Sequence, residues 1–495
     1  MTNNRTGEPG DAGRIPVRTV RVPLPETEAL PSYLALAERF GSDQVYLLDS
    51  AGGPAGDCRY RFIGFGELLS LTVTRDDVRI DGVPELLETV RARVEPVLDT
   101  SGETWRLADP HDLWQLLREL GSCFAVTGSA TEFRFGFLAY FGYDTARYVE
   151  ELPYLIEPDR DQPDVRMVLY RGFLVSDTSR EGAELRLHES PAWPSVDPAE
   201  LTTLLTAANR TQPAPADGLP PVSTVDSDVD ESSYLAIVDK CLKHIAVGDI
   251  YQVQIGQELT IRSTADPVTV YRRLLERNPS PYMYLAPFGD QTVIGASPEL
   301  FVRVEDRQVT MRPIAGTAPR GPDDDARARR LRTDPKERAE HTMLVDLCRN
   351  DIGRICERDT LDVPDKLVIE RYSHVLHLVS TVTGRAQPDR DAYDIIAALF
   401  PAGTMTGAPK IRAMEIIEET EHSRRGLYAG ALGLVDVGGY VNLALCIRTL
   451  IHHDGAYRTR ASAGIVADSV PGREWRETLA KLAAGYWAVT GEEPQ

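Results

Sequence analysis

Two pairs of glutamates constrain the fold of this chain more than any other feature. The first pair is Glu337 and Glu340, and the second is Glu474 and Glu477. Each pair has i,i+3 spacing, which on a helix places both carboxylates on one face. Two such helices facing each other would hold four repelling carboxylates around one point, so a cation is needed between them. Oxygen ligands of this kind suit Mg²⁺. The alternative is two solvated helix faces in an acidic protein.

Composition excludes several classes of partner. The chain has 495 residues and a net charge of -21, which argues against a nucleic-acid partner or an anionic membrane surface. No apolar run reaches the roughly 18 residues that span a bilayer, and the polar N-terminus lacks an export signal. The six cysteines are scattered with no C-x-x-C, which fits a reducing cytoplasm without structural zinc. We therefore expect a cytoplasmic protein that binds neither nucleic acid nor membrane.

The chain divides at a Pro-rich segment. We expect a disordered tail over residues 1–15, an N-terminal region over 16–210, a Pro-rich linker over 211–229 and a C-terminal region over 230–495. Predicted strands and helices come in groups rather than in strict βαβ alternation. This pattern favours an α+β fold of mostly antiparallel sheets with helices outside.

Periodicity places the main elements of the C-terminal region. Apolar residues at helical spacing predict helices over 232–246 and 474–489, and a further helix carries Glu337 and Glu340. Alternating or short apolar runs predict strands over 250–257, 292–294, 300–304, 309–311, 430–437 and 440–449.

Eight short phrases follow one another in this region. They are Gly248-Asp249-Ile250-Tyr251-Gln252-Val253, Ala296-Ser297-Pro298-Glu299-Leu300, Arg312-Pro313-Ile314-Ala315-Gly316-Thr317, Glu337-Arg338-Ala339-Glu340-His341, Arg349-Asn350-Asp351-Ile352-Gly353-Arg354, Ser373-His374-Val375-Leu376-His377, Phe400-Pro401-Ala402-Gly403-Thr404-Met405-Thr406-Gly407-Ala408-Pro409-Lys410 and Ala461-Ser462-Ala463-Gly464-Ile465-Val466. This set, in this order, resembles the chorismate-utilising enzymes, and most closely anthranilate synthase component I. The resemblance is dense from Ser232 onward and looser before it.

The resemblance implies a fold and a cofactor. The fold would be a large, mostly antiparallel β-sheet sandwich with helices outside. In these enzymes a nucleophile adds to the chorismate ring while the C4 hydroxyl leaves, and Mg²⁺ on the ring carboxylate offsets its charge. By motif, Glu340 and Glu477 match the direct metal ligands, and Glu337 and Glu474 match a supporting pair.

Three residues bear on the chemistry. Glu299 matches the family's general acid, which protonates the departing hydroxyl. Relatives that use water carry a lysine base where this chain has Gln252, and relatives that aminate C4 carry a nucleophilic lysine where it has Ala315. Neither residue here can play those parts. The resemblance therefore implies that ammonia adds at C2.

Further residues match the substrate site. His377 matches the histidine associated with pyruvate loss from the aminated intermediate, and Thr404 matches a contact in the Gly-rich turn. Lys481 lies on the same helical face as Glu477, where it could approach a carboxylate of the substrate or metal site, or form an intrahelical ion pair. The residues expected to bind substrate are Tyr428, Arg448, Ala463, Gly464, Gly407 and Lys481.

The chain departs from its relatives at a second site. Feedback-inhibited anthranilate synthases usually carry Leu-Leu-Glu-Ser in a tryptophan pocket, where this chain has Leu47-Leu48-Asp49-Ser50, and an aromatic where it has Leu434. Losing an aromatic wall removes contact area. We expect weak or absent tryptophan feedback, as in an enzyme of secondary metabolism. The possible allosteric residues are Ser50, Pro281, Tyr282 and Met283.

The expected activity is C2 amination of chorismate to 2-amino-2-deoxyisochorismate, followed by pyruvate elimination to anthranilate. The alternative is a 2-amino-2-deoxyisochorismate synthase that keeps the enolpyruvyl group and serves an antibiotic pathway. A water-using isochorismate synthase is opposed by Gln252, and a silent paralogue by the full set of carboxylates. No glutaminase motif is visible, so a separate glutamine amidotransferase subunit would supply ammonia in a hetero-oligomer.

Overall fold

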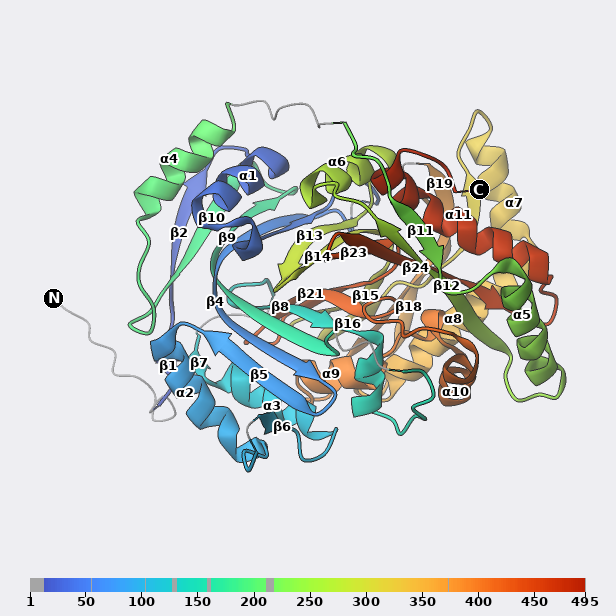
Figure 1. Cartoon of the computed structure of the whole chain (residues 1–495), viewed down its shortest axis with the longest axis horizontal. Coiled ribbons are helices and arrows are strands. Elements are labelled where there is room, and N and C mark those ends of the chain that lie inside the picture. Colours follow the sequence, from blue (N-terminus) through green and yellow to red (C-terminus); the bar gives the residue numbers. More distant parts are fainter. Residues whose placement is uncertain are drawn as a thin grey trace.

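The computed structural model in Figure 1 describes residues 13–54, 56–102, 104–126, 131–157, 162–210, 218–372 and 374–494. The tail predicted over 1–15 lies outside these ranges except for its last residues. The first part of the linker predicted over 211–229, residues 211–217, also lies outside them, and residues 224–227 of that segment form a strand.

Strands from both regions of the chain build one antiparallel system. Those of the N-terminal region are β2 (Arg18–Leu24), β3 (Val45–Asp49), β4 (Tyr60–Thr74), β5 (Asp77–Gly82), β6 (Trp105–Arg106), β8 (Gly136–Phe141), β9 (Val165–Asp177) and β10 (Ala183–Glu189). Those that follow are β11 (Thr224–Ser227), β12 (Gln252–Arg262), β13 (Tyr282–Phe288), β14 (Gln291–Ser297), β15 (Leu300–Glu305), β16 (Gln308–Met311), β17 (Ile314–Pro319), β18 (Asp362–Arg371), β19 (Val375–Arg385), β20 (Gly407–Ala408), β21 (Ala431–Asp436), β22 (Val441–Leu445), β23 (Thr449–His453) and β24 (Ala456–Ile465). A parallel pair, β1 (Ile15–Pro16) with β7 (Phe124–Ala125), stands apart.

Two pairings join the regions that the sequence separates. β3 pairs with β13, and β8 pairs with β21. From β12 the pairings run through β24, β23, β14, β13, β3, β4 and β9. From β9 they continue through β8, β21, β22, β15, β16 and β19. Strands of the N-terminal and C-terminal regions therefore pair with each other in one continuous series.

Helices cover the outer faces of the strands (Figure 1). They are α1 (Ala29–Phe40), α2 (Pro84–Val94), α3 (Asp112–Ser122), α4 (Pro198–Ala208), α5 (Glu231–Ala246), α6 (Pro267–Arg277), α7 (Asp324–Thr333), α8 (Pro335–Gly353), α9 (Ala392–Leu399), α10 (Lys410–Thr420) and α11 (Pro471–Thr490). Single 3₁₀ turns include η1 (Ser42–Gln44), η2 (Glu95–Val97), η3 (Tyr143–Tyr148) and η4 (Gly403–Met405).

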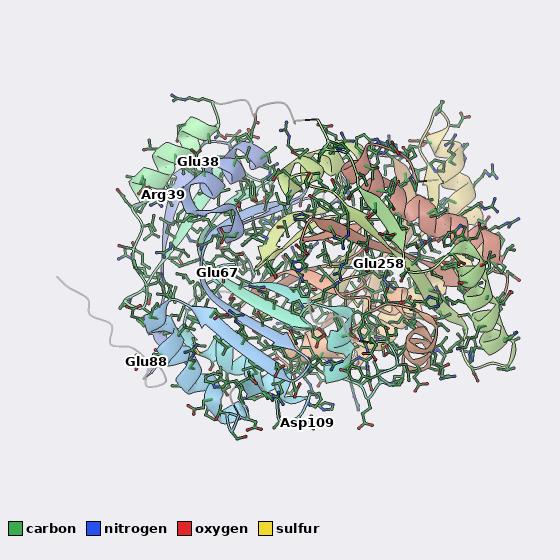
Figure 2. The ribbon with its side chains drawn as sticks, viewed as in Figure 1. Glu38, Arg39, Glu67, Glu88, Asp109 and Glu258 are labelled. Carbon is green, nitrogen blue, oxygen red and sulfur yellow. The ribbon has the colours of Figure 1, made fainter. Side chains whose placement is uncertain are left out.

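Three clusters of buried side chains form the layers. An aromatic-rich cluster lies between the strand faces, where β3, β4, β9 and β13 meet β8, β21 and β22. One outer cluster lies under α1, α4 and α6, and another under α2, α3, α8 and α9. Figure 2 shows side chains filling the space between the ribbons. This helix–sheet–sheet–helix order is the predicted antiparallel sandwich with helices outside, and that prediction is confirmed.

Glycines make room for the rings of the inner layer. Tyr46 on β3 lies opposite Gly64 on β4, and Tyr284 on β13 lies opposite Gly295 on β14. A Cβ on either glycine would come 2.0 Å from the facing ring. Each tyrosine therefore lies across its partner strand and stays almost fully buried.

The predicted strand over 440–449 is wrong in one respect. The structure divides it into β22 and β23, because Arg448 adopts a left-handed backbone conformation with φ of 53°. A bulky residue rarely takes that conformation within a strand. The break turns the chain between the two strands at the residue predicted to bind substrate. The described part of the chain has no helix with the length and apolar character of a membrane span.

Candidate active site

Glu337 and Glu474 lie in the first turns of α8 and α11, and Glu340 and Glu477 lie in the second turns. Asp334 caps α8 by accepting hydrogen bonds from the backbone N–H groups of Lys336 and Glu337 at 2.9 and 3.2 Å. Prolines start both helices, at a position where the missing N–H costs nothing. Carboxylates are stabilised at a helix N-terminus by the helix dipole. Local sequence therefore places the first glutamate of each pair at a favourable helix end.

The carboxylates of the two helices act on each other. Burial raises the pKa of Glu340, and the charges of Glu337 and Glu477 raise it further. Burial also raises the pKa of Glu337 and of Glu474, and Glu477 adds to both shifts. Because Glu477 lies on α11 while Glu337 and Glu340 lie on α8, the structure brings the two pairs within electrostatic reach.

This acidic cluster fits a hard cation. Its donors are all carboxylate oxygens, the ligands that Mg²⁺ prefers. Among the residues that the structure describes, no three acidic, His or Cys side chains converge into a preformed metal cage. A cation held here would therefore need oxygens from a substrate as well. Lys481 offsets part of the charge, since its Nζ lies 2.6 Å from Glu477 Oε1 and donates to the Ser462 carbonyl at 2.9 Å.

Glu299 is a buried acid in the turn between β14 and β15. Burial raises its pKa to about 8, although a hydrogen bond from Thr404 and the charge of Lys481 oppose the shift. The Thr404 hydroxyl donates to Glu299 Oε1 at 3.3 Å. The effect of Lys481 connects Glu299 with the acidic cluster. A carboxylic acid with this pKa keeps its proton at neutral pH and can donate it.

Gln252 lies on the other side of the same Gly-rich turn. It is 2% exposed, and its Oε1 is buried without a hydrogen-bond partner among the described residues. Gly407 packs on its backbone, since a Cβ there would lie 2.1 Å from the Gln252 carbonyl oxygen. A Cβ at Gly464 on β24 would lie 2.9 Å from Gln252 Nε2. Both glycines therefore make room for Gln252, and the side-chain Oε1 of Gln252 remains available to a ligand.

Arg448 and His377 lie near each other at the strand break. Burial lowers the pKa of Arg448, and its guanidinium has no hydrogen bond or ion pair within the described ranges. Burial lowers the pKa of His377 to about 4, and the charge of Arg448 contributes. His377 Nδ1 lies 3.2 Å from the Gly316 carbonyl oxygen, which can only accept. The neutral ring therefore carries its proton on Nδ1 and keeps Nε2 as an acceptor.

Tyr428 belongs to a chain of hydrogen-bonded side chains beside these residues, and its other two members, Ser462 and Gln254, were not predicted as site residues. The hydroxyls of Tyr428 and Ser462 lie 2.6 Å apart, and Ser462 donates to Gln254 Oε1 at 3.1 Å. The period-2 alternation of the predicted strand could have found Gln254, because it shares a face with Gln252. Ala463 is fully buried on β24, and Ala315 is buried on β17, where its methyl group offers no nucleophile.

Two other motif residues serve the framework. Lys410 at the start of α10 donates to both oxygens of Asp351 on α8, at 3.0 and 2.9 Å. Asp351 is 2% exposed. The pair ties the Gly-rich turn to the helix that carries Glu337 and Glu340. Buried pairs of this kind fix position more than they add stability.

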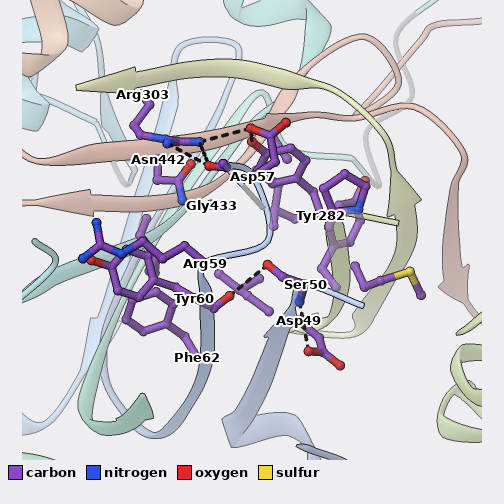
Figure 3. Close-up of a pocket in the computed structure, with 18 of the residues that line it drawn as sticks. Asp49, Ser50, Asp57, Arg59, Tyr60, Phe62, Tyr282, Arg303, Gly433 and Asn442 are labelled. Atoms are coloured by element: carbon purple, nitrogen blue, oxygen red, sulfur yellow. Dashed lines mark hydrogen bonds and ion pairs between the residues drawn. The ribbon is translucent and has the colours of Figure 1, made fainter. Parts of the chain in front are cut away.

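The predicted allosteric residues line a separate cavity of about 260 Å³ (Figure 3). Ser50, Pro281, Tyr282, Met283 and Leu434 all lie on its wall. Charged groups crowd it as well. Asp57 accepts hydrogen bonds from Tyr282 at 3.0 Å and from Arg303 at 3.3 Å, and it is also ion-paired with Arg312. Its volume lies just below the roughly 300–1,000 Å³ of typical ligand pockets.

Comparison with known proteins identifies the family. Residues 89–485 match the family model described as chorismate binding enzyme. The chain is 64% identical over 480 residues to the 2-amino-4-deoxychorismate synthase of Streptomyces globisporus, covering 96% of this chain and 97% of that one. It is 39% identical over 476 residues to anthranilate synthase component 1 of Streptomyces coelicolor, covering 93% and 86%.

A solved structure agrees with these matches. Anthranilate synthase component I from Streptococcus pneumoniae superposes with a TM-score of 0.72 and 31% sequence identity, over 86% of this chain and 92% of that chain. The chain belongs to the family of chorismate binding enzymes, and its fold is that of anthranilate synthase component I. The resemblance drawn from the sequence motifs is confirmed.

The raised pKa of Glu299 predicts a pH-dependent stability. The unfolded carboxyl ionises near its ordinary pKa of 4.5, whereas the folded carboxyl has a pKa of about 8 and keeps its proton up to that pH. The folded state therefore binds the extra proton, and its stability falls as pH rises through this window. Chemical denaturation should show Glu299→Gln gaining on the wild type by about 1.4 kcal/mol per pH unit. Parallel stability curves for the two proteins would show that Glu299 is not held protonated.

Proposed function

We propose that this enzyme adds ammonia to C2 of chorismate with loss of the C4 hydroxyl, giving 2-amino-2-deoxyisochorismate. The observation that carries the proposal is Glu299, a buried acid with a pKa of about 8 on the opposite side of the Gly-rich turn from Gln252. Glu299 can protonate the hydroxyl group that leaves. The Gln252 amide cannot act as the base that would deprotonate an attacking water molecule. Ammonia needs no such base.

The name of the Streptomyces globisporus relative supports this choice. A 2-amino-4-deoxychorismate carries an amino group at C2 and has lost the oxygen at C4. That is the constitution of 2-amino-2-deoxyisochorismate, with chorismate instead of isochorismate taken as the parent compound of the name. Amination at C4 would leave a different product and would need a nucleophile where Ala315 stands.

The proposed step balances as follows. The ammonia lone pair forms the C2–N bond, the two ring double bonds each move by one position, and the C4–O bond breaks. The proton of Glu299 goes to the departing oxygen, which leaves as water, and the new ammonium group releases a proton. General acid catalysis of this kind contributes about 10²–10⁴-fold. Thr404 holds the acid in place through its hydrogen bond to Oε1.

The unpaired guanidinium suits the substrate's carboxylates. Arg448 has a half-buried head without an internal ion pair among the described residues, and its fork can bind both oxygens of the enolpyruvyl carboxylate. Tyr428 is held by Ser462 beside it. We place the backbone of Ala463 and Gly464 on the same side of the substrate.

We assign Mg²⁺ to the acidic cluster. Glu340 and Glu477 would be its direct ligands, and Glu337 and Glu474 would support them. When bound, the ion would offset the charge of the ring carboxylate and orient the ring. Lys481 holds Glu477 by its ion pair, and its positive charge favours the deprotonated form of Glu340 and Glu474, which is the form that binds a metal ion.

A second product is favoured by His377. Its neutral ring keeps Nε2 as an acceptor, so it could take the C2 proton as the C3–O bond breaks and pyruvate leaves. The product would then be anthranilate, as the name of the 39% identical relative indicates. The higher identity to the Streptomyces globisporus enzyme favours the product that retains the enolpyruvyl group.

Ammonia would come from a glutamine amidotransferase subunit in a hetero-oligomer. We place this complex in the cytoplasm, in line with free cysteines throughout the described residues. The retained-enolpyruvyl product would serve a secondary-metabolite pathway, and anthranilate would serve tryptophan biosynthesis.

A product assay tests the proposed function. The purified chain is incubated with chorismate, Mg²⁺ and an ammonium salt, and the product is identified by mass spectrometry. We expect 2-amino-2-deoxyisochorismate with its enolpyruvyl group retained, and Glu299→Gln should lower the rate by about 10²-fold or more.

The other products of this assay are equally informative. Anthranilate fluorescence would show that pyruvate is eliminated and that the final product is anthranilate instead of 2-amino-2-deoxyisochorismate. Isochorismate as the sole product would refute the argument from Gln252, and a C4-aminated product would refute the argument from Ala315.

The small, charged cavity near Ser50 predicts weak tryptophan binding. Leu434 replaces an aromatic wall, and ion pairs to Asp57 fix the polar lining. Isothermal titration with tryptophan should give no binding in the micromolar range, and tryptophan should leave the amination rate unchanged. Micromolar affinity would contradict the proposed loss of feedback. A Leu434→Phe variant, which restores the aromatic, gives the matched comparison.

A further inference from the structure

The most exposed large apolar side chains of the described residues gather on one side of the molecule. Val247 is 76% exposed, Tyr251 69%, Leu155 62% and Tyr154 56%. Ile411 on α10 lies between them and is also exposed. We call these five side chains the apolar face. Exposed apolar patches of this kind mark interaction sites.

Hydrogen bonds and an ion pair join the parts of the apolar face. The backbone N–H groups of Leu155 and Ile156 donate to Glu418 Oε1 on α10 at 2.7 and 3.0 Å. At the other end of α10, the N–H of Tyr251 donates to the Ala408 carbonyl at 2.7 Å. Arg412 on α10 lies 3.8 Å from Asp249. In Figure 1 α10 lies between the loop after η3 and the lower end of α5.

A buried charge network holds the loop over residues 150–157 in place. Arg147 lies 3.7 Å from the centre of the Tyr154 ring and donates to the carbonyls of Leu152 and Pro153. Arg424 donates to the Ile156 carbonyl at 2.8 Å and pairs with Glu418 at 3.0 Å. Tyr154 and Leu155 are therefore presented to solvent by a fixed framework, which lowers the entropy cost of binding a partner.

The apolar face lies directly outside the proposed ammonia position. Tyr251 is exposed, while its neighbour Gln252 is 2% exposed and points its unpartnered Oε1 inward. Tyr251 directly precedes β12, so one step along the chain leads from an exposed side chain to the buried side chain of Gln252. Gly407 and Gly464 leave space around the Gln252 side chain. A small nucleophile entering here would meet a hydrogen-bond acceptor that nothing else uses.

We propose that the apolar face docks the glutamine amidotransferase subunit and that ammonia enters beside Tyr251 to reach Gln252. This proposal rests on the proposed function, because only a partner that supplies ammonia needs to release its product next to Gln252. Ammonia released elsewhere would be protonated and diluted in water. A second copy of this chain would have no reason to cover this position.

Negative charge beside the apolar face indicates which charges the partner carries at the edge of its docking surface. A broad cleft of about 980 Å³ next to the 150–157 loop carries the carboxylates of Asp76, Asp109, Glu150, Glu151 and Glu157. Figure 2 labels Asp109 at the lower edge of the molecule. The docking surface of the amidotransferase therefore carries lysines or arginines opposite this cleft, and its association rate falls as salt rises.

Two activities separate docking from chemistry. Product formation is measured once with an ammonium salt and once with glutamine plus the amidotransferase subunit of the source organism. Leu155→Asp and Ile411→Asp place charges on the apolar face without touching the catalytic residues. Both should keep the ammonium-dependent rate within about twofold and lose about tenfold or more of the glutamine-dependent rate. Sedimentation should show the same loss of the complex.

The control is Val225→Asp, which puts a charge on an exposed valine of β11, a strand that pairs with the far end of β12. It should keep both rates. The docking proposal is overturned if Leu155→Asp and Ile411→Asp retain the glutamine-dependent rate, if Val225→Asp loses it equally, or if the wild-type chain and the subunit do not associate. Failure of the wild type to use ammonium would instead overturn the proposed function.

Discussion

Repulsion among the carboxylates of α8 and α11 is the constraint on which the site depends. Burial first, and the charges of neighbouring carboxylates in addition, raise the pKa values of Glu337, Glu340 and Glu474, so the folded chain holds these groups together at a cost. The framework keeps them there by polar contacts. Gln257 on β12 donates to Thr478 on α11 at 2.6 Å, and the Lys410–Asp351 pair fixes α8. A cation would convert this stored repulsion into binding energy.

The residues that choose the reaction are different ones. In the proposed function, Mg²⁺ on the carboxylates offsets charge, whereas the choice of nucleophile depends on what faces the ring. Gln252 offers a carbonyl oxygen and no base, and Ala315 offers a methyl group. Glu299 contributes the proton in the proposed reaction. In the proposed function, the choice of nucleophile thus rests on two uncharged side chains in a site otherwise dominated by charge. The apolar face outside Gln252 is the surface at which we propose that the ammonia enters.

Local patterns predicted the elements well and their assembly less well. The helices that carry Glu340 and Glu477 and the strand that carries Gln252 follow from periodicity and capping, which act over a few residues. The pairing of β3 with β13 does not, because it joins segments far apart in sequence, such as Leu48 and Tyr284. Arg448 was predicted within a strand and instead breaks it, since its backbone conformation is set by the surrounding packing. The Tyr428–Ser462–Gln254 chain required three separate strands or turns to meet.

Thermal unfolding during a Mg²⁺ titration, without substrate, tests the acidic cluster most directly. A ligand that binds only the folded state raises the melting temperature. We predict that Mg²⁺ raises it for the wild type. Without Mg²⁺, Glu340→Gln should melt above the wild type because one repelling charge is gone, and it should lose most of the response to the ion. Glu276→Gln on α6 should behave as the wild type. A wild-type melting temperature that ignores Mg²⁺, or a Glu340→Gln variant that responds fully, would contradict a metal centre between α8 and α11.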